Sequence, residues 1–298
     1  MAPLRFRVSE EHAGERLDRV LAKRPEIGSR AGAKRLVADG AVRVDDVPRP
    51  KSHRLAGGER VEVELPARSG LRPEDIEVRV IWQDEQLLVV DKPAGIVVHP
   101  SGRRTSGTLV HGLLALGAEG GEEGRPGIVH RLDRDTSGIM VVARSRQAHT
   151  ALQRLIRRRE VDRRYLALVR GQPRSRTGRI EAPIGRHRHD RTRHSLDTES
   201  PRDAVTWFEV QELLGERALL EVRLETGRTH QIRVHLEAIG LPVSGDPVYG
   251  VPDLGLERQF LHAHRLLLRH PLTGQQLDLS SPLPPDLAAA LERARSAP

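Results

Sequence analysis

The sequence predicts an α+β protein in two parts, a small N-terminal domain followed by a larger one. The 298 residues are enough for both, and the larger part can bury a substantial core. Helical and strand patterns are mixed along the chain. Residues 66–73, rich in loop-forming residues, have no hydrophobic periodicity and are typical of a linker. We therefore place the small domain at 1–66, the linker at 67–77 and the large domain at 78–298.

The small domain is predicted to contain two helices and a few short strands between residues 15 and 65. Gly40 is expected to end the second helix, and Asp45 and Asp46 to form a turn. The apolar positions that define these elements are Leu17, Val20, Leu21, Ala33, Leu36, Val37, Val42, Val44, Val61, Val63 and Leu65.

One face of the second helix is basic and carries Arg30, Lys34 and Arg35. A basic helix face beside a small sheet suits contact with the phosphate groups of nucleic acid. The formal net charge of +8 also favours a polyanionic partner. The alternative is a solvated helix face without a partner, which is the commoner explanation of a run of charges.

The composition excludes several classes of site. The chain has no cysteine, so disulfides, thiolate metal sites and cysteine nucleophiles are ruled out. The N-terminus lacks the apolar run of a signal peptide, and no segment approaches membrane-spanning length. We therefore expect a soluble, cytoplasmic protein that does not bind membranes.

The large domain shows strand and helix signals in no regular alternation. Thr229 is expected to cap its last predicted helix and Gly240 to end that helix. Strands are predicted at 80–82, 87–90, 165–169, 207–210 and 219–224, helices at 152–159 and 229–239, and a long polar loop at 185–203.

The most informative segment is 130–143, where a polar cluster runs directly into an apolar, β-branched run. This pattern predicts a loop that leads into a buried strand, an arrangement that holds reactive side chains still. Asp133 lies between Arg131 and Arg134, so its carboxylate should stay ionised and free to act as a nucleophile. The alternative, which spacing alone favours, is that Asp133 and Asp135 cap turns and pair with arginines.

Several motifs follow one another in a fixed order along the large domain. They lie at 89–95, 98–100, 130–138, 163–169, 226–236, 245–250, 261–263 and 270–272. This ordered set resembles the motifs of the RluA-type pseudouridine synthases, which modify uridines in large-subunit ribosomal RNA and some transfer RNAs. The resemblance covers about 78–290 and implies a mixed, largely antiparallel central sheet with flanking helices. Residues 1–66 resemble a small α-L-type RNA-binding domain.

The resemblance implies a cofactor-free isomerisation in RNA. The uracil is detached from the ribose, turned, and rejoined through its carbon 5. Asp133 would be the catalytic aspartate, either attacking the anomeric carbon or removing the neighbouring sugar proton. Tyr165 would stack on the target base and help remove the carbon-5 proton. Stacking is the preferred of these two roles, because a phenol is a poor base at neutral pH unless its site shifts its pKa. Arg233 would pair with Asp133. Further RNA contacts are expected at Arg131, Arg228, His230 and Gln231.

The residue types suit this chemistry independently of the resemblance. A base that is detached and turned must leave the stack, and an aromatic platform holds it. A carboxylate near the sugar stabilises an oxocarbenium-like centre. We interpret Asp135 as a structural partner, assign no catalytic role to Lys92, and expect neither a metal nor a cofactor. For His187, His189 and His194, we prefer an RNA-contacting loop to a metal site.

Two other functions compete with this prediction. One is a non-catalytic RNA-binding or ribosome-assembly protein on the same scaffold, although Asp133, Tyr165 and Arg233 are all present. The other is an RNA-cleaving hydrolase, for which a two-metal carboxylate set is lacking. Large-subunit ribosomal RNA is preferred to transfer RNA as the substrate, and a monomer is expected. The modified uridine is left open.

Overall fold

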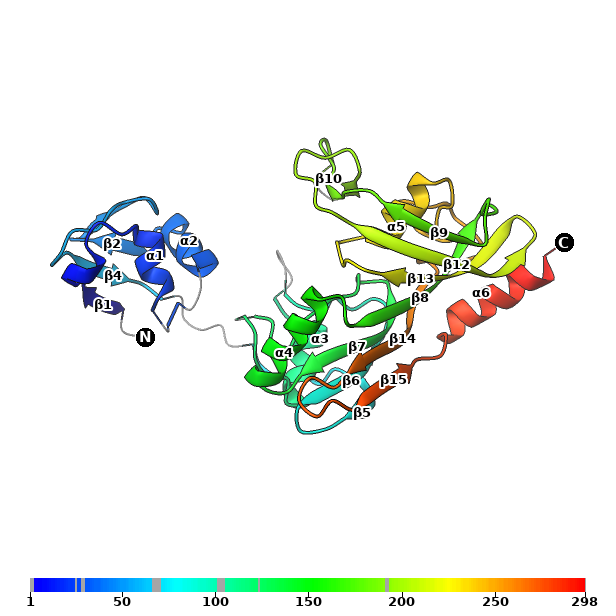
Figure 1. The fold of residues 1–298 in the computed structure, drawn as a ribbon, viewed down its shortest axis with the longest axis horizontal. Helices are drawn as coiled ribbons and strands as arrows, with labels where there is room; N and C mark the ends of the chain where they lie inside the picture. Colours follow the sequence, from blue (N-terminus) through cyan, green and yellow to red (C-terminus); the bar gives the residue numbers. More distant parts are fainter. Residues whose placement is uncertain are drawn as a thin grey trace. The chain divides into compact units, whose positions relative to one another are not determined.

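The computed structural model describes residues 3–24, 26–27, 30–65, 71–100, 105–122, 124–190 and 193–297. The chain divides into two compact units, Met1–Gly70 and Leu71–Pro298, each with its own hydrophobic core (Figure 1). Residues 67–70 of the predicted linker lie outside the described residues. Both units combine helices with sheets, as expected for an α+β protein.

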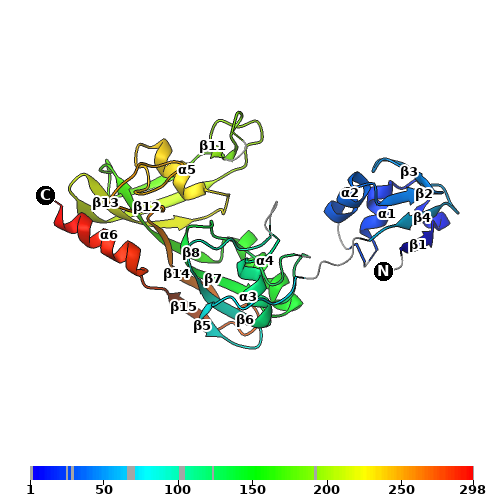
Figure 2. The same cartoon turned by 180° about the vertical axis from the view of Figure 1, so that it is seen from behind.

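The N-terminal unit is a four-stranded antiparallel sheet with two helices packed on it (Figure 2). Asp45 and Asp46 both have positive φ, 46° and 65°, and form the tight turn between the second and third strands. In chain order the elements are β1 (Leu4–Arg7), the 3₁₀ helix η1 (Glu10–His12), α1 (Leu17–Ala22), α2 (Arg30–Ala38), β2 (Val42–Val44), β3 (Val47–Pro48) and β4 (Arg60–Val63).

The large unit is built on a mixed sheet of nine strands. Among the described strands, β7 and β14 form the one parallel pair, and all other pairs are antiparallel. Its order is β5 (Arg79–Gln83), β6 (Leu87–Lys92), β7 (Ser137–Ala143), β14 (Leu261–Arg269), β8 (Asp162–Arg170), β13 (Arg217–Leu224), β12 (Val205–Leu214) and β9 (Thr177–Glu181), with β15 (Gln276–Ser280) on β14.

The parallel pair lies near the centre of this sheet, and its first strand, β7, follows directly on the loop that carries Asp133. Every residue of β7 is buried, which explains its unbroken apolar run. Gly138, with φ 118°, allows β14 to approach closely, since a Cβ there would lie 2.2 Å from the carbonyl oxygen of Ala263. The loop before β7 is therefore anchored at the middle of the core.

Four helices accompany the sheet. They are α3 (Leu109–Ala115), α4 (Arg146–Arg157), α5 (Gln231–Ala238) and α6 (Pro285–Ser296). In Figure 1, α3 and α4 lie beside β6 and β7, whereas α5 lies on the part of the sheet that contains β12 and β13. Among the described residues, no helix combines the length and apolar character needed to span a membrane.

The structure corrects three sequence-based predictions of local structure. The helix predicted at 152–159 begins earlier, because Ser145 caps α4 by accepting a hydrogen bond from the backbone N–H of Ala148. The residue before α5 is His230, in the left-handed conformation (φ 57°), and not Thr229. The polar loop at 185–203 contains a small hairpin of β10 (Gly185–Arg186) and β11 (His194–Ser195).

Candidate active site

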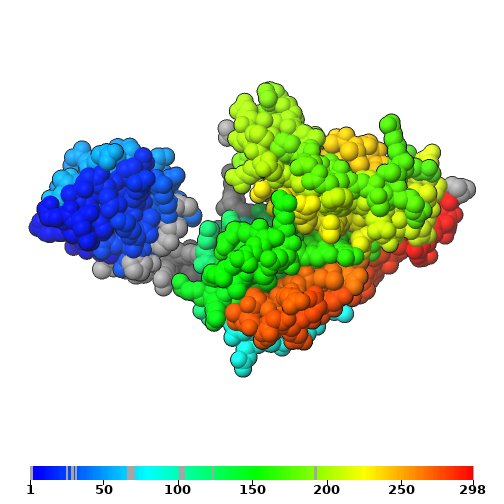
Figure 3. All heavy atoms as spheres, viewed as in Figure 1, coloured from blue at the N-terminus to red at the C-terminus, as the bar shows by residue number. Residues whose placement is uncertain are grey.

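Asp133, Tyr165 and Arg233 come from three separate elements and line one cavity. Asp133 lies in the loop before β7, Tyr165 on β8 and Arg233 in α5. The cavity has a volume of about 600 Å³. Figure 3 shows the surface of the large unit hollowed between the green region that includes α4 and the yellow-green region above it. This volume lies within the range typical of small-molecule sites, so it has room for a nucleotide base.

Arg233 contacts Asp133, as predicted, but it is held mainly by another carboxylate. Its Nη1 donates to Asp133 Oδ2 at 3.3 Å. Its Nε and Nη2 donate to the two carboxylate oxygens of Asp246 at 2.6 and 2.8 Å. Asp246 also accepts from the backbone N–H groups of Val248 and Tyr249. Asp246 therefore fixes the direction in which the guanidinium presents itself to Asp133.

Both partners in this buried pair are held in their charged forms. Burial alone would raise the pKa of Asp246, but the hydrogen bonds from Arg233 outweigh it and hold that pKa below its usual range. Burial opposes the charge on Arg233 in the same way, yet Asp246 and then Asp133 raise the pKa of the guanidinium. Sequence analysis assigned no role to Asp246, although its motif was part of the resemblance.

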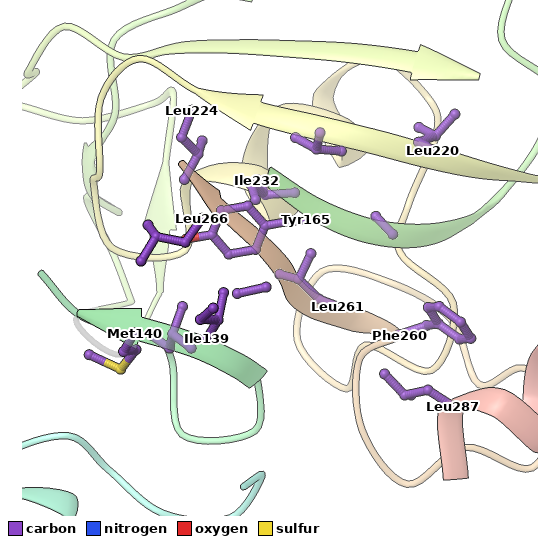
Figure 4. Packing of buried hydrophobic residues seen from close by; sticks show 14 of the residues in the cluster. Ile139, Met140, Tyr165, Leu220, Leu224, Ile232, Phe260, Leu261, Leu266 and Leu287 are labelled. Atoms are coloured by element: carbon purple, nitrogen blue, oxygen red, sulfur yellow. The ribbon is translucent and has the colours of Figure 1, made fainter. Parts of the chain in front are cut away.

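The ring of Tyr165 forms part of the apolar wall of the cavity. It is only 5% exposed, and Figure 4 shows it among Leu224, Ile232 and Leu261, which also line the cavity. Burial raises the pKa of Tyr165, so the phenol stays protonated near neutral pH. This environment favours a stacking surface over a general base.

Two basic side chains, Lys92 and Arg258, hold the backbone of the Asp133 loop by hydrogen bonds to its carbonyl oxygens. Lys92 is fully buried, and its Nζ donates to the carbonyl oxygens of Pro93, Ile96 and Arg134 at 2.7, 3.0 and 2.9 Å. Burial lowers the pKa of Lys92 to about 7. Its amine thus points into backbone oxygens and serves to position the loop.

Arg258 supports the next carbonyl along the same loop. Its Nη1 donates to the carbonyl oxygen of Asp135 at 3.0 Å, while its Nε and Nη2 bind Asp286 at the start of α6. The carboxylate of Asp135 forms a bidentate ion pair with Arg134. These contacts tie the loop to the C-terminal helix and give Asp135 a structural partner.

His130 closes the loop onto the strand that follows it. Its Nε2 accepts a hydrogen bond from the backbone N–H of Val141 at 3.1 Å. Burial lowers the pKa of His130 to about 3, so the ring is neutral at physiological pH. A neutral ring is what this contact needs, because a protonated Nε2 has no lone pair with which to accept.

A second aromatic group lies behind Arg233. The ring of Tyr249 has the guanidinium carbon of Arg233 4.9 Å from its centroid. Its hydroxyl accepts from the backbone N–H of His194 at 2.7 Å and lies 2.9 Å from His230 Nδ1. Burial lowers the pKa of His230, which favours the neutral ring. Sequence analysis assigned no role to Tyr249, although this residue lies in the motif at 245–250.

The four predicted RNA contacts of the large unit all line the cavity, but they differ in availability. Arg131 and Arg228 are exposed on its wall, and His230 is half-buried. Gln231 is buried, and its amide is fully used by Thr226, the N–H of Arg228, and two oxygens on β12. The geometry of Gln231 favours a role in holding the loop at 226–229, and an RNA contact there stays a prediction.

The basic helix α2 of the N-terminal unit presents two unpaired cations. The side chains of Lys34 and Arg35 are exposed and make no hydrogen bond or ion pair within the described residues. Arg30, in contrast, donates to buried Asp18 at 3.1 Å, and Arg16 donates to the same carboxylate. Burial would raise the pKa of Asp18, but these two hydrogen bonds hold it below its usual range. Arg30 is therefore partly structural.

The histidines at 187, 189 and 194 do not come together as ligands. The rings of His187 and His189 are 6.1 Å apart, whereas His194 lies against His230 at 5.4 Å. Across the described ranges, no group of three or more His, Asp or Glu side chains is placed to hold a metal ion.

Comparisons with known proteins agree on one family. The family model described as RNA pseudouridylate synthase matches residues 86–238. The chain is 43% identical to an uncharacterized RNA pseudouridine synthase of Mycobacterium bovis, over 98% of each protein. It is 41% identical to the ribosomal large subunit pseudouridine synthase D of Xanthomonas campestris, over 97% of this chain and 91% of that protein.

A solved structure gives the same result for the fold. Human RNA pseudouridylate synthase domain containing 4 is similar with a TM-score of 0.59 and 28% identity, covering 73% of this chain and 93% of its own. This agreement confirms the predicted α+β fold with its mixed, largely antiparallel sheet.

Proposed function

The chain belongs to the RNA pseudouridylate synthase family and is therefore an isomerase that acts on uridine in RNA, and we propose that Asp133 is its catalytic residue. The observation that carries this assignment is the contact between Asp133 and Arg233 in a cavity that also contains Tyr165. The carboxylate is accessible to a substrate, since 17% of its side chain is exposed, while its guanidinium partner is buried.

The cavity suits a single everted nucleotide. The target base leaves its stack and lies against the ring of Tyr165 and its apolar neighbours. This places the ribose beside the carboxylate of Asp133. Arg233 keeps that carboxylate charged and turned toward the sugar, and Asp246 holds Arg233 in position.

The reaction breaks the bond between base nitrogen 1 and the anomeric carbon and forms one from base carbon 5 to the same carbon. The proton on carbon 5 is lost and nitrogen 1 gains one, so the product is an isomer of the substrate. Asp133 acts on the sugar by one of two routes, attack on the anomeric carbon or removal of the neighbouring sugar proton. The apolar wall retains the free uracil and limits access of water during its rotation.

We further propose that the substrate is large-subunit ribosomal RNA. The name of the Xanthomonas campestris relative and the nearly full-length match support this choice. In this proposal residues 1–66 form an RNA-binding domain joined by the linker at 67–77, and Lys34 and Arg35 supply phosphate contacts. The protein would act in the cytoplasm as a monomer.

The experiment that tests this proposal is release of tritium from RNA labelled at carbon 5 of uridine. Transcripts of large-subunit ribosomal RNA and a mixture of transfer RNAs are compared at equal uridine concentration. We expect release from the ribosomal transcript and little from transfer RNA. Equal or greater release from transfer RNA would contradict the substrate assignment.

A further inference from the structure

A buried arginine in the cavity, Arg163, has no side-chain partner among the residues that the structure describes. Arg163 lies on β8 two residues before Tyr165, so the two side chains project from the same face of the strand. Both line the cavity, and Arg163 is only 7% exposed. Its Nε has no contact with solvent and no hydrogen bond. Within the described residues, its guanidinium also forms no ion pair.

The nearby carboxylates are already used by other arginines. Glu225, on the cavity wall, pairs with Arg159 and also accepts from the indole N–H of Trp207. Asp162 and Glu221 both bind Arg164. Among the described residues, Arg159 and Arg164 thus have carboxylate counter-ions, whereas Arg163 has none.

An unpaired guanidinium in a buried position destabilises the fold. Removing a charge from water costs several kcal/mol of free energy unless a nearby anion compensates it. Such a cost is tolerated where a ligand supplies the missing charge. RNA offers a suitable anion in its phosphates, whose oxygens match the planar fork of arginine. A uracil carbonyl is neutral and would leave the charge uncompensated.

We propose that Arg163 binds the backbone phosphate next to the target nucleotide. This inference rests on the proposed function, in which Tyr165 stacks on the target base. Residues i and i+2 of a strand are about 7 Å apart, which places the guanidinium beside the base platform and not under it. Arg163 is then a substrate-binding residue that holds the everted nucleotide by its backbone.

The backbone that faces the guanidinium carries no side chain. Gly227, in the loop between β13 and α5, faces the guanidinium, and a Cβ there would lie 3.0 Å from Nη1 of Arg163. Any larger residue would press on the guanidinium. Arg131 and Arg228 are exposed on the wall of the same cavity, which gives the RNA backbone cationic neighbours before and after the buried site.

The test compares Arg163→Met with Arg164→Met, a matched control on the same strand whose charge is already paired. Binding of a short single-stranded RNA that contains uridine is measured as a function of salt, and thermal stability is measured without RNA. For R163M we expect affinity to fall by about 10- to 100-fold, the range of a hydrogen bond to a charged group. The salt slope should fall by about 0.7, which is one phosphate of a single strand.

The two variants should differ in thermal stability. R163M should melt at the same temperature as the wild type or higher, because it removes an uncompensated charge. R164M should melt lower, because it leaves Asp162 without its arginine and Glu221 with His264 alone, and its salt slope should match the wild type. Arg163→Lys should keep the salt slope and lose part of the affinity.

An unchanged salt slope in R163M would overturn the phosphate assignment, whatever its melting temperature. Failure of the proposed function is detected separately. If the wild-type protein released no tritium from uridine-labelled RNA, the proposed isomerisation would be contradicted. The binding and melting measurements would still decide whether Arg163 binds a phosphate.

Discussion

Arg233 is bound more closely by Asp246 than by Asp133. Two hydrogen bonds of 2.6 and 2.8 Å join it to Asp246, and one of 3.3 Å joins it to Asp133. The proposed catalytic carboxylate, Asp133, thus meets a guanidinium that a second, fully buried carboxylate has already oriented. This preorganisation leaves Asp133 free to react, because Asp133 makes a single hydrogen bond to Arg233 and not a bidentate ion pair.

Asp246→Asn should reduce both stability and activity. It leaves buried Arg233 with Asp133, at the longer distance, as its one charged partner among the described residues, and breaking one side of a buried ion pair typically costs about 3–5 kcal/mol. We expect unfolding in urea to report a loss of this order. The control is Asp278→Asn, which breaks a surface pair with Arg265 and should cost about 1 kcal/mol or less. Equal losses in the two variants would contradict the role of Asp246.

Removing the ring of Tyr165 should weaken binding of the target nucleotide. Stacking of a base on an aromatic side chain contributes about 1–3 kcal/mol, so Tyr165→Ala should raise the Kd for uridine-containing RNA by roughly 5- to 150-fold. Tyr165→Phe keeps the ring and should bind within about threefold of the wild type. The measurement is titration by fluorescence anisotropy. If the phenylalanine variant bound as weakly as the alanine variant, a stacking role would be ruled out.

Acid should destabilise the protein through His130. Its pKa is about 3 in the folded protein, whereas an unfolded histidine titrates near 6.5. The unfolded chain therefore binds more protons between these values, so stability is fully present above pH 6.5 and is lost as the pH falls toward 3. Each pH unit in this window costs at most about 1.4 kcal/mol.

The matched variant for this prediction is His130→Gln, whose side-chain oxygen can still accept from the N–H of Val141. Urea unfolding at pH 7 and pH 5 should show a smaller loss in H130Q than in the wild type. The same loss in both proteins would place the acid sensitivity elsewhere.

Lys34 and Arg35 should contribute to RNA affinity without affecting chemistry. Replacing both with alanine should lower the salt slope of RNA binding by about one to two phosphate contacts and leave turnover at saturating RNA unchanged. Arg30→Ala should act differently and lower the melting temperature, because it removes a partner of buried Asp18. An unchanged slope in the double variant would mean that this helix face does not meet RNA.

Much of the fold followed from hydrophobic patterning. The strands now seen as β5, β6, β8, β12 and β13 had β-branched or aliphatic runs that predicted them. Strand β14 was missed because His262, His264 and Arg265 interrupt its apolar pattern. Its polar side chains find partners only in the folded protein, such as Ser137 for His262 and Glu221 for His264.

The candidate site was predicted only in part. Asp133, Tyr165 and Arg233 could be assigned because they lie in motifs of the family, and the structure places them together. Asp246 and Arg258 could not be found from spacing, because each acts through a residue far away in the chain. Their roles depend on which long-range pairs form, and a single sequence does not specify those pairs.

The most direct test of the account is tritium release from carbon 5 of uridine by Asp133→Asn. This variant keeps the shape of the side chain and removes its charge, so the fold and RNA affinity should be retained while release falls below detection. Asp135→Asn, two residues along the same loop, should still turn over within about tenfold of the wild type, since its carboxylate binds Arg134. Sustained tritium release by D133N in a folded, RNA-binding protein would contradict the central claim that this carboxylate performs the isomerisation.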